Sequence, residues 1–133
     1  TVRYRLDELP AKPDYYFAVE FNFAGFPCQQ PDRYYYHASK KNAGSTDGLI
    51  DLISSDHLGI VDEYLGLDCK VQTSSPAGFW AFPIQTVSQS EAGFELVHQG
   101  ITMIAYFLPQ PDNARHWEVE VVLKMDAHRR KPS

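Results

Sequence analysis

The chain has 133 residues, a size typical of one domain with a single core. Its formal net charge is −5, and one basic cluster, Arg129 to Lys131, lies in the polar C-terminal segment, so the rest of the chain is more acidic still. This acidic balance argues against a nucleic-acid or anionic-membrane surface. The chain is 44% hydrophobic and lacks an apolar run of the roughly 18 residues that a membrane helix needs, which predicts a soluble globular domain.

The apolar residues alternate with a period of two, which is the pattern of half-buried strands. The clearest case is 16–24, where four apolar side chains share one face: Phe17, Val19, Phe21 and Phe23. Segment 117–125 alternates in the same way, and 101–108 is apolar on both faces, as expected of a central strand. In chain order the predicted strands are 2–6, 16–24, 33–38, 49–54, 59–64, 67–74, 79–88, 94–99, 101–108 and 117–125, with the spacing of a meander.

Turn residues separate these segments at 25–27, 42–45, 75–78 and 109–113. No window of a dozen residues carries a helical apolar stripe, and the nearest, 47–55, is long enough for only a turn or two. The sequence therefore predicts an all-β antiparallel sandwich in one domain, 1–126, followed by a polar, disordered tail, 127–133.

Two cysteines, Cys28 and Cys69, are too few for a disulfide framework or a four-ligand zinc site. Isolated thiols fit a reducing compartment, so we expect a cytoplasmic location, and whether the two cysteines pair stays open. The first residue is Thr1, and no secretion signal follows it. We therefore expect a mature or excised piece of a longer protein.

Glu91 and Glu95 form the most suggestive acid pair, since two carboxylates with different pKa values are the usual machinery of glycoside hydrolysis. Acids next to glycine are, however, far more often solvated turn residues. We therefore favour a structural motif of Ser88, Ser90, Glu91 and Glu95, in which side chains tie a strand end at a bend at Gly93.

Other chemistry-bearing residues lack a recognisable pattern. The acids between 42 and 69 offer oxygen ligands for calcium but form no compact calcium-binding loop, so a solvated acidic edge is the favoured interpretation; they are Asp47, Asp51, Asp56, Asp62, Glu63 and Asp68. The histidines have no metal-binding spacing, and no serine or cysteine lies in a nucleophile motif. We predict no catalytic residue, no metal site and no cofactor.

The aromatic residues exceed what a small core can fully bury, and flat rings with a polar edge suit the faces of sugars. The candidate carbohydrate contacts are Tyr34, Tyr35, Tyr36 and Trp80. Consecutive tyrosines on a strand alternate between its two faces, so packing is the favoured role for most of them.

Two segments carry a family resemblance. They are Phe17-Ala18-Val19-Glu20-Phe21-Asn22-Phe23 and the run from Pro83 to Glu95, which contains Val87-Ser88-Gln89-Ser90-Glu91-Ala92-Gly93-Phe94-Glu95. Together with Gln99-Gly100, they resemble the C-terminal β-sandwich region of glycoside hydrolase family 57, which includes α-amylases and 4-α-glucanotransferases. The resemblance spans residues 2–125, and the second segment is its most specific part.

The resemblance implies a two-part enzyme. An N-terminal (β/α) barrel carries the glutamate nucleophile and the aspartate acid/base, and a β-sandwich similar to the galactose mutarotase supersandwich follows it. Because the motifs of those catalytic residues lie upstream of Thr1, no residue of this chain inherits their roles. Mutarotases use a glutamate and histidine pair that no pair here matches, so fold analogy gives no warrant for that activity.

We therefore expect a non-catalytic accessory domain of an α-glucan-active enzyme. Its expected partner is the catalytic barrel of the same polypeptide, with α-glucan as a second candidate, and neither nucleic acid nor membrane is expected. The first alternative is a stand-alone carbohydrate-binding module, and the second is a small mutarotase-like enzyme using Glu91 or Glu95. The isolated domain is predicted to self-associate, with a symmetric dimer as the simplest outcome.

Overall fold

The computed structural model describes residues 1–12, 14–26 and 30–127, and these form eight strands without a helix. The strands are β1 (Val2–Leu6), β2 (Phe17–Ala24), β3 (Arg33–His37), β4 (Lys40–Ser45), β5 (Ile50–Asp62), β6 (Leu67–Ser90), β7 (Gly93–Phe107) and β8 (Trp117–Ala127). No helix in the described part is long and apolar enough to cross a membrane. Cys28 and the predicted tail beyond Ala127 lie outside the described residues.

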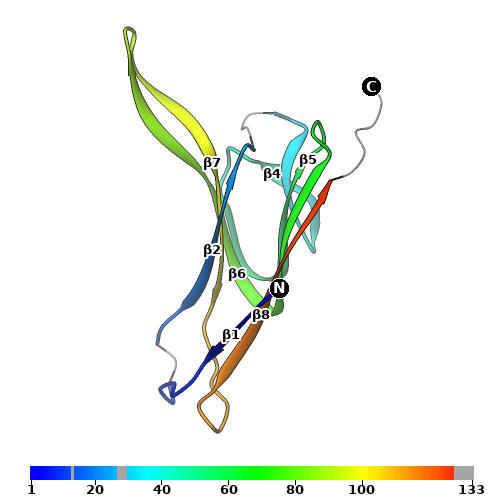
Figure 1. Cartoon of the computed structure of the whole chain (residues 1–133), viewed down its shortest axis with the longest axis vertical. Coiled ribbons are helices and arrows are strands. Elements are labelled where there is room, and N and C mark those ends of the chain that lie inside the picture. The colour runs from blue at the N-terminus through cyan, green and yellow to red at the C-terminus, as the bar shows by residue number, and fades with distance from the viewer. Residues whose placement is uncertain (13, 27–29, 128–133) are drawn as a thin grey trace.

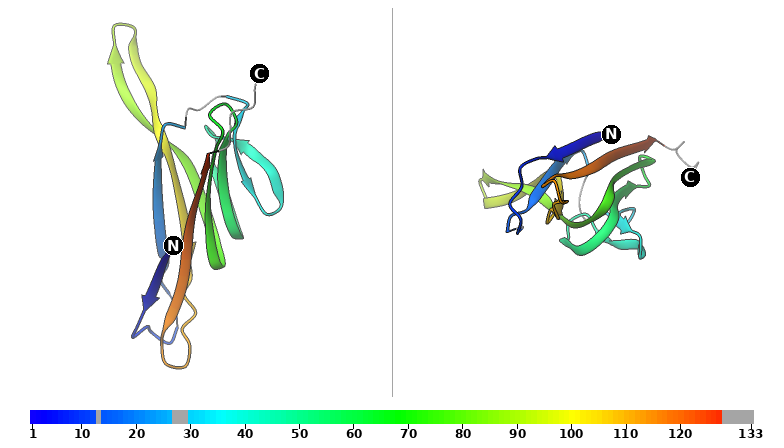
Figure 2. Two further views of the ribbon diagram at one scale, coloured as in Figure 1. Left: turned by 45° about the vertical axis from the view of Figure 1, so that its right-hand side comes forward. Right: turned by 90° about the horizontal axis from the view of Figure 1, so that it is seen from below.

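All pairings are antiparallel, and they join the strands in the order β1-β8-β6-β5-β3-β4, with β7 between β6 and β2. This continuous sheet folds over so that β2 and β7 face β3, β4 and β5 across the core (Figures 1 and 2). The prediction of an all-β antiparallel sandwich is confirmed. The strand order differs from a simple meander, because β8 and β7 both pair with β6.

Strand β6 belongs to both layers. Residues 67–73 pair with β8 and residues 78–90 pair with β7, on the same edge of the strand. We call β2, β7 and residues 78–90 of β6 the front layer, and β1, β8, residues 67–73 of β6, β3 and β4 the back layer. β5 runs along the other edge of β6 and shifts its register between Leu52 and His57, as strands do where they cross from one layer to the other.

The turn predicted at 75–78 is therefore wrong. Pro76 lies between Thr73, where pairing with β8 ends, and Gly78, where pairing with β7 begins. Proline lacks a backbone donor, and the change of partner places it where the ladder is interrupted. The segments predicted as separate strands on either side become one bent strand, and the same merging produces β5 and β7.

The loop predicted at 42–45 is also wrong, since Lys40–Ser45 forms β4, an edge strand paired with β3. Its residues are mostly polar, so no apolar alternation marked it in the sequence. Backbone pairing with an existing neighbour stabilises this strand, and that pairing is not visible in local sequence.

The core lies between the two layers. In the front layer the apolar residues of β2 pair with buried residues of β7: Phe17 with Phe107, Val19 with Ala105, Phe21 with Met103 and Phe23 with Ile101. The back layer contributes the opposite wall, including Tyr35, Leu58, Ile60, Cys69, Val71, Val119 and Val121. The alternation that predicted strands 16–24 and 117–125 thus also identified their core faces, although Leu123 and Met125 are exposed.

Candidate functional site: the aromatic face of the front layer

The outer side of the front layer carries exposed aromatic side chains. The pairing register places Glu20, Ile104, Trp80 and Asp51 in one row across β2, β7, β6 and β5. The rows on either side contain Tyr106 with Gly78, and Thr102 with Phe82. Because directly paired residues share a face, these side chains all point away from the core.

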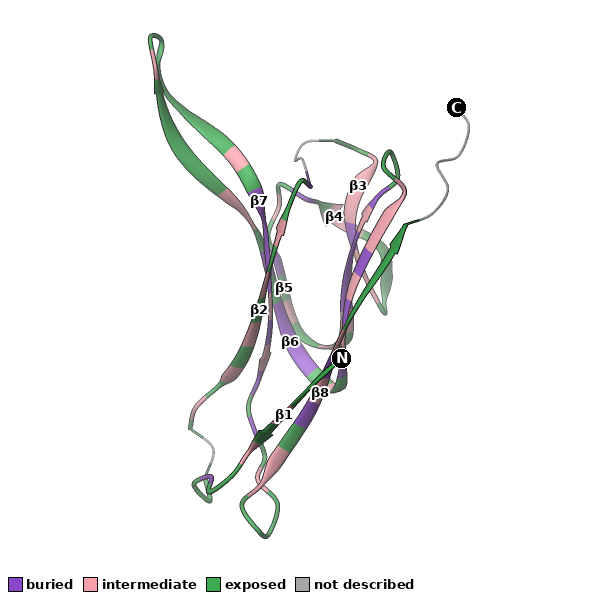
Figure 3. Ribbon diagram, in the orientation of Figure 1, coloured by how far each residue is buried: buried purple, intermediate pink, exposed green. Residues whose placement is uncertain are grey.

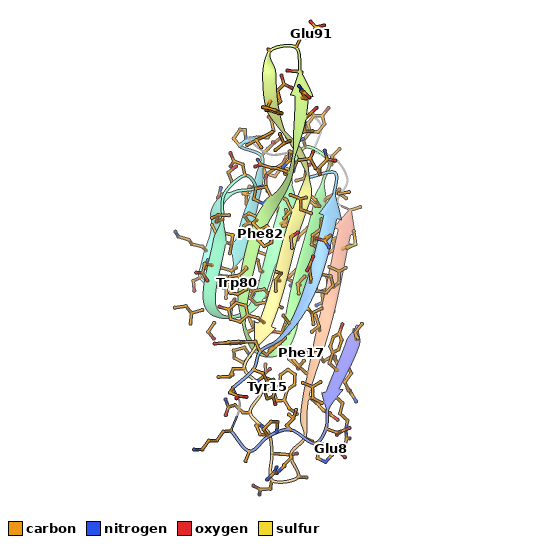
Figure 4. All side chains as sticks on the ribbon, turned by 90° about the vertical axis from the view of Figure 1, so that its left-hand side faces the viewer. Glu8, Tyr15, Phe17, Trp80, Phe82 and Glu91 are labelled. Carbon is orange, nitrogen blue, oxygen red and sulfur yellow. The ribbon has the colours of Figure 1, made fainter. Side chains whose placement is uncertain are left out.

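Four rings make up what we call the aromatic face: Tyr16, Trp80, Phe82 and Tyr106. Trp80 and Tyr106 lie 4.5 Å apart between ring centroids, and Tyr16 meets Tyr106 edge-on at 5.9 Å. Trp80 is 45% exposed and Tyr16 is 69% exposed. Figure 4 views this side of the molecule, with Phe82 above Trp80 on the front layer.

Gly78 decides the position of the Tyr106 ring. A Cβ atom at residue 78 would lie 1.9 Å from Cζ of Tyr106, so the ring occupies the space that any other residue would fill. The Tyr106 hydroxyl donates to the carbonyl oxygen of Leu52 at 3.5 Å, which places the ring across β6 towards β5. Burial raises the pKa of the Tyr106 hydroxyl, so it stays protonated at neutral pH.

Polar groups flank the rings on both sides. Trp80 Nε1 donates to Oδ1 of Asp51 at 3.2 Å on the β5 side. On the β2 side, the Asn22 amide donates to Glu20 at 3.0 Å and accepts from the Thr102 hydroxyl at 2.7 Å. The arrangement is an apolar ring surface with hydrogen-bonding groups at its edges, which is how proteins bind a polar ligand with apolar faces.

Replacing Gly78 with alanine tests this packing. We expect a loss of about 1–3 kcal/mol in the free energy of unfolding, because the new methyl group overpacks the site and must displace the Tyr106 ring. Denaturant unfolding measures this loss, and tryptophan fluorescence reports the change around Trp80. In a Tyr106→Ala background the same substitution should cost little, and an equal cost in both backgrounds would show that the ring is not the obstacle.

The predicted carbohydrate contacts do not lie together. Trp80 is on the aromatic face, whereas Tyr34, Tyr35 and Tyr36 are on β3 in the back layer. The Tyr35 ring has no exposed surface and is part of the core, so it cannot contact a ligand. Tyr34 donates to Glu63 at 2.8 Å, and Tyr36 lies over Gly59 and donates to Asp68 at 2.5 Å.

The Ser88 to Glu95 block forms a hairpin that extends beyond the sandwich, and Glu91 is at its tip (Figure 4). Ser90 donates to the carbonyl oxygen of Gly93 at 3.1 Å, the kind of side-chain tie predicted for this block. Ser88 pairs with Glu95 across the strands, and both Glu91 and Glu95 are exposed. The roles of these four residues stay predictions.

The acids between 42 and 69 have separate partners. Asp51 accepts from Trp80, Asp56 contacts His57 at 2.8 Å, and Asp62 pairs with Arg33 at 2.9 Å. Across residues 1–12, 14–26 and 30–127, no three His, Cys, Asp or Glu side chains are grouped to hold a metal ion. Cys69 is buried, and burial raises the pKa of its thiol.

A second concave region lies where β1 meets β8. This open groove of about 520 Å³ is lined by Arg5, Gln110, Asp112, His116, Trp117 and Glu118. Arg5 pairs with two carboxylates there, Asp7 at 2.8 Å and Glu118 at 3.5 Å, and His116 also contacts Asp7. Hydrogen bonds from Arg5 and His116 lower the pKa of the Asp7 carboxyl, which keeps it ionised at neutral pH.

The described strands thus define an all-β sandwich domain with one ring-covered outer face. Residues 1–121 match the family described as the C-terminal region of alpha-amylase/4-alpha-glucanotransferase, and the chain belongs to this family. Among solved structures, the crystal structure of 4-alpha-glucanotransferase from Thermococcus litoralis is similar, with a TM-score of 0.56 and 22% sequence identity. The similarity covers 95% of this chain and 16% of that chain. The comparison with curated proteins gave no match.

The predicted membership of an α-amylase and 4-α-glucanotransferase C-terminal family is confirmed. Sequence reasoning singled out Trp80 but missed its neighbours Tyr106 and Asp51, and Tyr16 beside Tyr106. One sequence signal could have identified Tyr106: it is the tyrosine of segment 101–108, which is otherwise largely apolar on both faces. Its proximity to Trp80 depends on Gly78, which in sequence looked like part of a turn.

Proposed function

We propose that this chain is a non-catalytic accessory domain of an α-glucan-active enzyme of glycoside hydrolase family 57, and that its aromatic face contacts α-glucan. The catalytic barrel of the same polypeptide carries out the chemistry, and the sandwich braces it. The observation that carries the glucan contact is the grouping of Trp80, Tyr106 and Tyr16 on one outer face. Family membership supports the connection to α-glucan enzymes.

The chemistry of the aromatic face matches that of a sugar chain. The axial C–H groups of a glucose ring give it an apolar face that packs on an aromatic ring, while its hydroxyls point to the sides. Here the rings are flanked by Asp51 on one side and by Glu20 and Asn22 on the other. Asp51 already holds the Trp80 indole, so the ring position is set before a ligand arrives.

The glucan contact is tested by measuring the binding of maltoheptaose to the purified chain, either by calorimetry or by NMR chemical shifts. We expect Trp80→Ala to weaken binding by about tenfold or more, because truncating a tryptophan anchor typically costs about 2 kcal/mol. The matched control is Phe94→Ala, which removes another exposed ring of the same layer far from the aromatic face. Equal binding by wild type and Trp80→Ala would contradict the proposed contact.

The same mixtures test the non-catalytic assignment. We expect no hydrolysis or transglycosylation products from maltoheptaose after prolonged incubation with this chain alone. Turnover that disappears in Glu91→Gln would overturn the assignment and favour the small sugar-active enzyme.

A stand-alone carbohydrate-binding module is the second candidate, because the aromatic face would serve it equally well. The accessory domain and the stand-alone module differ in the contacts that they require besides the sugar. An accessory domain needs a surface for its catalytic neighbour, whereas a stand-alone module needs only the sugar site. A chain with the full glucan affinity and no effect on any catalytic region would favour the module.

A further inference from the structure

The hairpin formed by residues 85–90 of β6 and 93–98 of β7 extends past the end of the sandwich as a two-stranded ribbon (Figure 3). Its side chains are exposed almost throughout, while the rest of both strands contributes to the core. We refer to these residues as the ribbon. An isolated two-stranded hairpin is marginally stable in water, so a ribbon that is exposed on both faces is an unusual feature for a domain.

The two faces of the ribbon differ in composition. The register pairs Val87 with Leu96, Gln89 with Phe94, and Gln85 with His98 on one face. Phe94 is 77% exposed, Leu96 is 69% exposed and Val87 is 66% exposed. The other face pairs Thr86 with Val97 and Ser88 with Glu95, and it is mostly polar. Val87, Phe94 and Leu96 therefore form an uncovered apolar strip, which uncharged polar side chains and no carboxylate accompany on this face, in a chain whose net charge is −5.

The apolar strip continues the core face of the front layer. On β6 the buried Phe79 and Ala81 face the core, and the alternate positions beyond them lead to Val87. The register shift after Ile84 places His98 on the same face of β7. His98 lies at the base of the ribbon, where its Nε2 donates to the carbonyl oxygen of Phe26, a core residue, at 2.5 Å. Beyond this point no described strand of the back layer pairs with or covers the ribbon.

The size of the strip indicates what covers it. Six residues per strand at 3.3 Å each, on two strands 4.8 Å apart, give a flat footprint on the order of 200 Å², and the side chains that stand above it bring the accessible area to roughly 400 Å². A stable complex between free partners usually buries about 800 Å² on each side. A second copy packed on this strip would therefore be held weakly. A region tethered in the same polypeptide needs far less contact area, because tethering gives it a millimolar effective concentration.

We propose that the apolar face of the ribbon packs into an apolar groove on the catalytic region of the same polypeptide. This inference rests on the proposed accessory function and names the surface that performs it. The matched part is 16% of the similar glucanotransferase chain, so proteins of that length have a large region outside the sandwich that can supply the groove. Val87, Phe94 and Leu96 are the anchors, and the polar face with Ser88 and Glu95 stays in water.

The first measurement is sedimentation equilibrium of this chain alone. We expect a monomer across the micromolar range, because the strip is too small to hold a free second copy. This expectation replaces the self-association predicted from the sequence. A tight dimer that Leu96→Glu dissociates and Thr86→Glu does not would overturn the proposal and assign the strip to a second copy.

The second measurement compares amide hydrogen exchange in this chain and in the polypeptide that includes the catalytic region. We expect amides of 93–98 to exchange at least about tenfold more slowly in the longer polypeptide, because packing suppresses local opening of the hairpin. Equal exchange in the two proteins would overturn the proposal. This comparison uses unmutated protein, so it does not depend on how a variant folds.

The third measurement compares Leu96→Glu with Thr86→Glu in the longer polypeptide. Each variant adds one carboxylate to an exposed ribbon position opposite an apolar side chain, but only Leu96 lies on the apolar face. We expect Leu96→Glu to separate unfolding of the sandwich and the catalytic region into two calorimetric transitions, while Thr86→Glu keeps one. Identical behaviour of the two variants would overturn the proposal. Maltoheptaose binding at Trp80 should be unchanged in both, so failure of the ribbon contact is distinguishable from failure of the glucan contact.

Discussion

Replacing Phe79 with alanine is expected to lower the free energy of unfolding by about 3–5 kcal/mol. The Phe79 ring is fully buried on β6, where the strand is flanked by Leu52 of β5 and Ala105 of β7. Removing it loses the transfer free energy of the ring and leaves a cavity that a hydrogen-bonded sheet cannot close by collapsing. Since domains are typically stable by about 5–15 kcal/mol, this loss is a large share of the total.

Phe94→Ala is the matched control for this measurement. The same chemical change on the exposed ribbon should alter the free energy of unfolding by less than about 0.5 kcal/mol, because the ring is already in water. Denaturant midpoints of the two variants and wild type are compared under identical conditions. If Phe94→Ala were as costly as Phe79→Ala, the ribbon would be packed in this chain, and the proposed docking surface would be occupied.

The second large effect is expected at Arg33, the partner of a fully buried carboxylate. The Asp62 side chain has no exposed surface; its Oδ2 accepts from Arg33 Nε at 2.9 Å and its Oδ1 accepts from the Leu65 amide at 2.9 Å. Arg33→Met keeps most of the side-chain length but removes the positive charge. Because this leaves a buried charge uncompensated, we expect a loss of about 3–5 kcal/mol in the free energy of unfolding.

The double variant Arg33→Met with Asp62→Leu tests the cause of that loss. Replacing both partners by apolar groups should recover most of the stability, because the cost comes from the unpaired charge and not from the missing attraction. Arg5→Met is the surface control. Arg5 also forms ion pairs, but they are exposed to water, and we expect no measurable change in its denaturant midpoint. An unchanged midpoint in Arg33→Met would contradict the burial of Asp62.

Much of the fold could be predicted because local patterns and tertiary packing agree. The alternation in 16–24 and 117–125 puts apolar residues on one side, and the sandwich buries that side against the opposite layer. The predicted strand 101–108 corresponds to the C-terminal half of β7, which lies between β2 and β6, as expected of a segment with two apolar faces. These segments have one favourable way to bury their side chains.

The wrong predictions concern segments whose secondary structure depends on pairing with a neighbouring strand. Pro76 and Gly78 are turn residues in local sequence, yet β6 passes through them because it exchanges β8 for β7 at that point. The polar residues of β4 lack a strand pattern, and β3 supplies the pairing that makes them a strand. Register and partner choice depend on the whole sheet, so they are not encoded within any short window.

The fold class, the alternating core faces and the family resemblance were predictable without a structure, because they depend on residue type and spacing along the chain. Which rings remain in water depends on tertiary packing. Tyr35 and Trp80 are both aromatic residues on strands, but Tyr35 faces the core of the back layer and Trp80 faces outward beside Tyr106. Likewise, the Ser88 to Glu95 block was the most specific segment of the resemblance, but its two-faced ribbon emerged only from the register of β6 on β7. Exposure is a property of what covers a residue, and the covering elements come from distant parts of the chain.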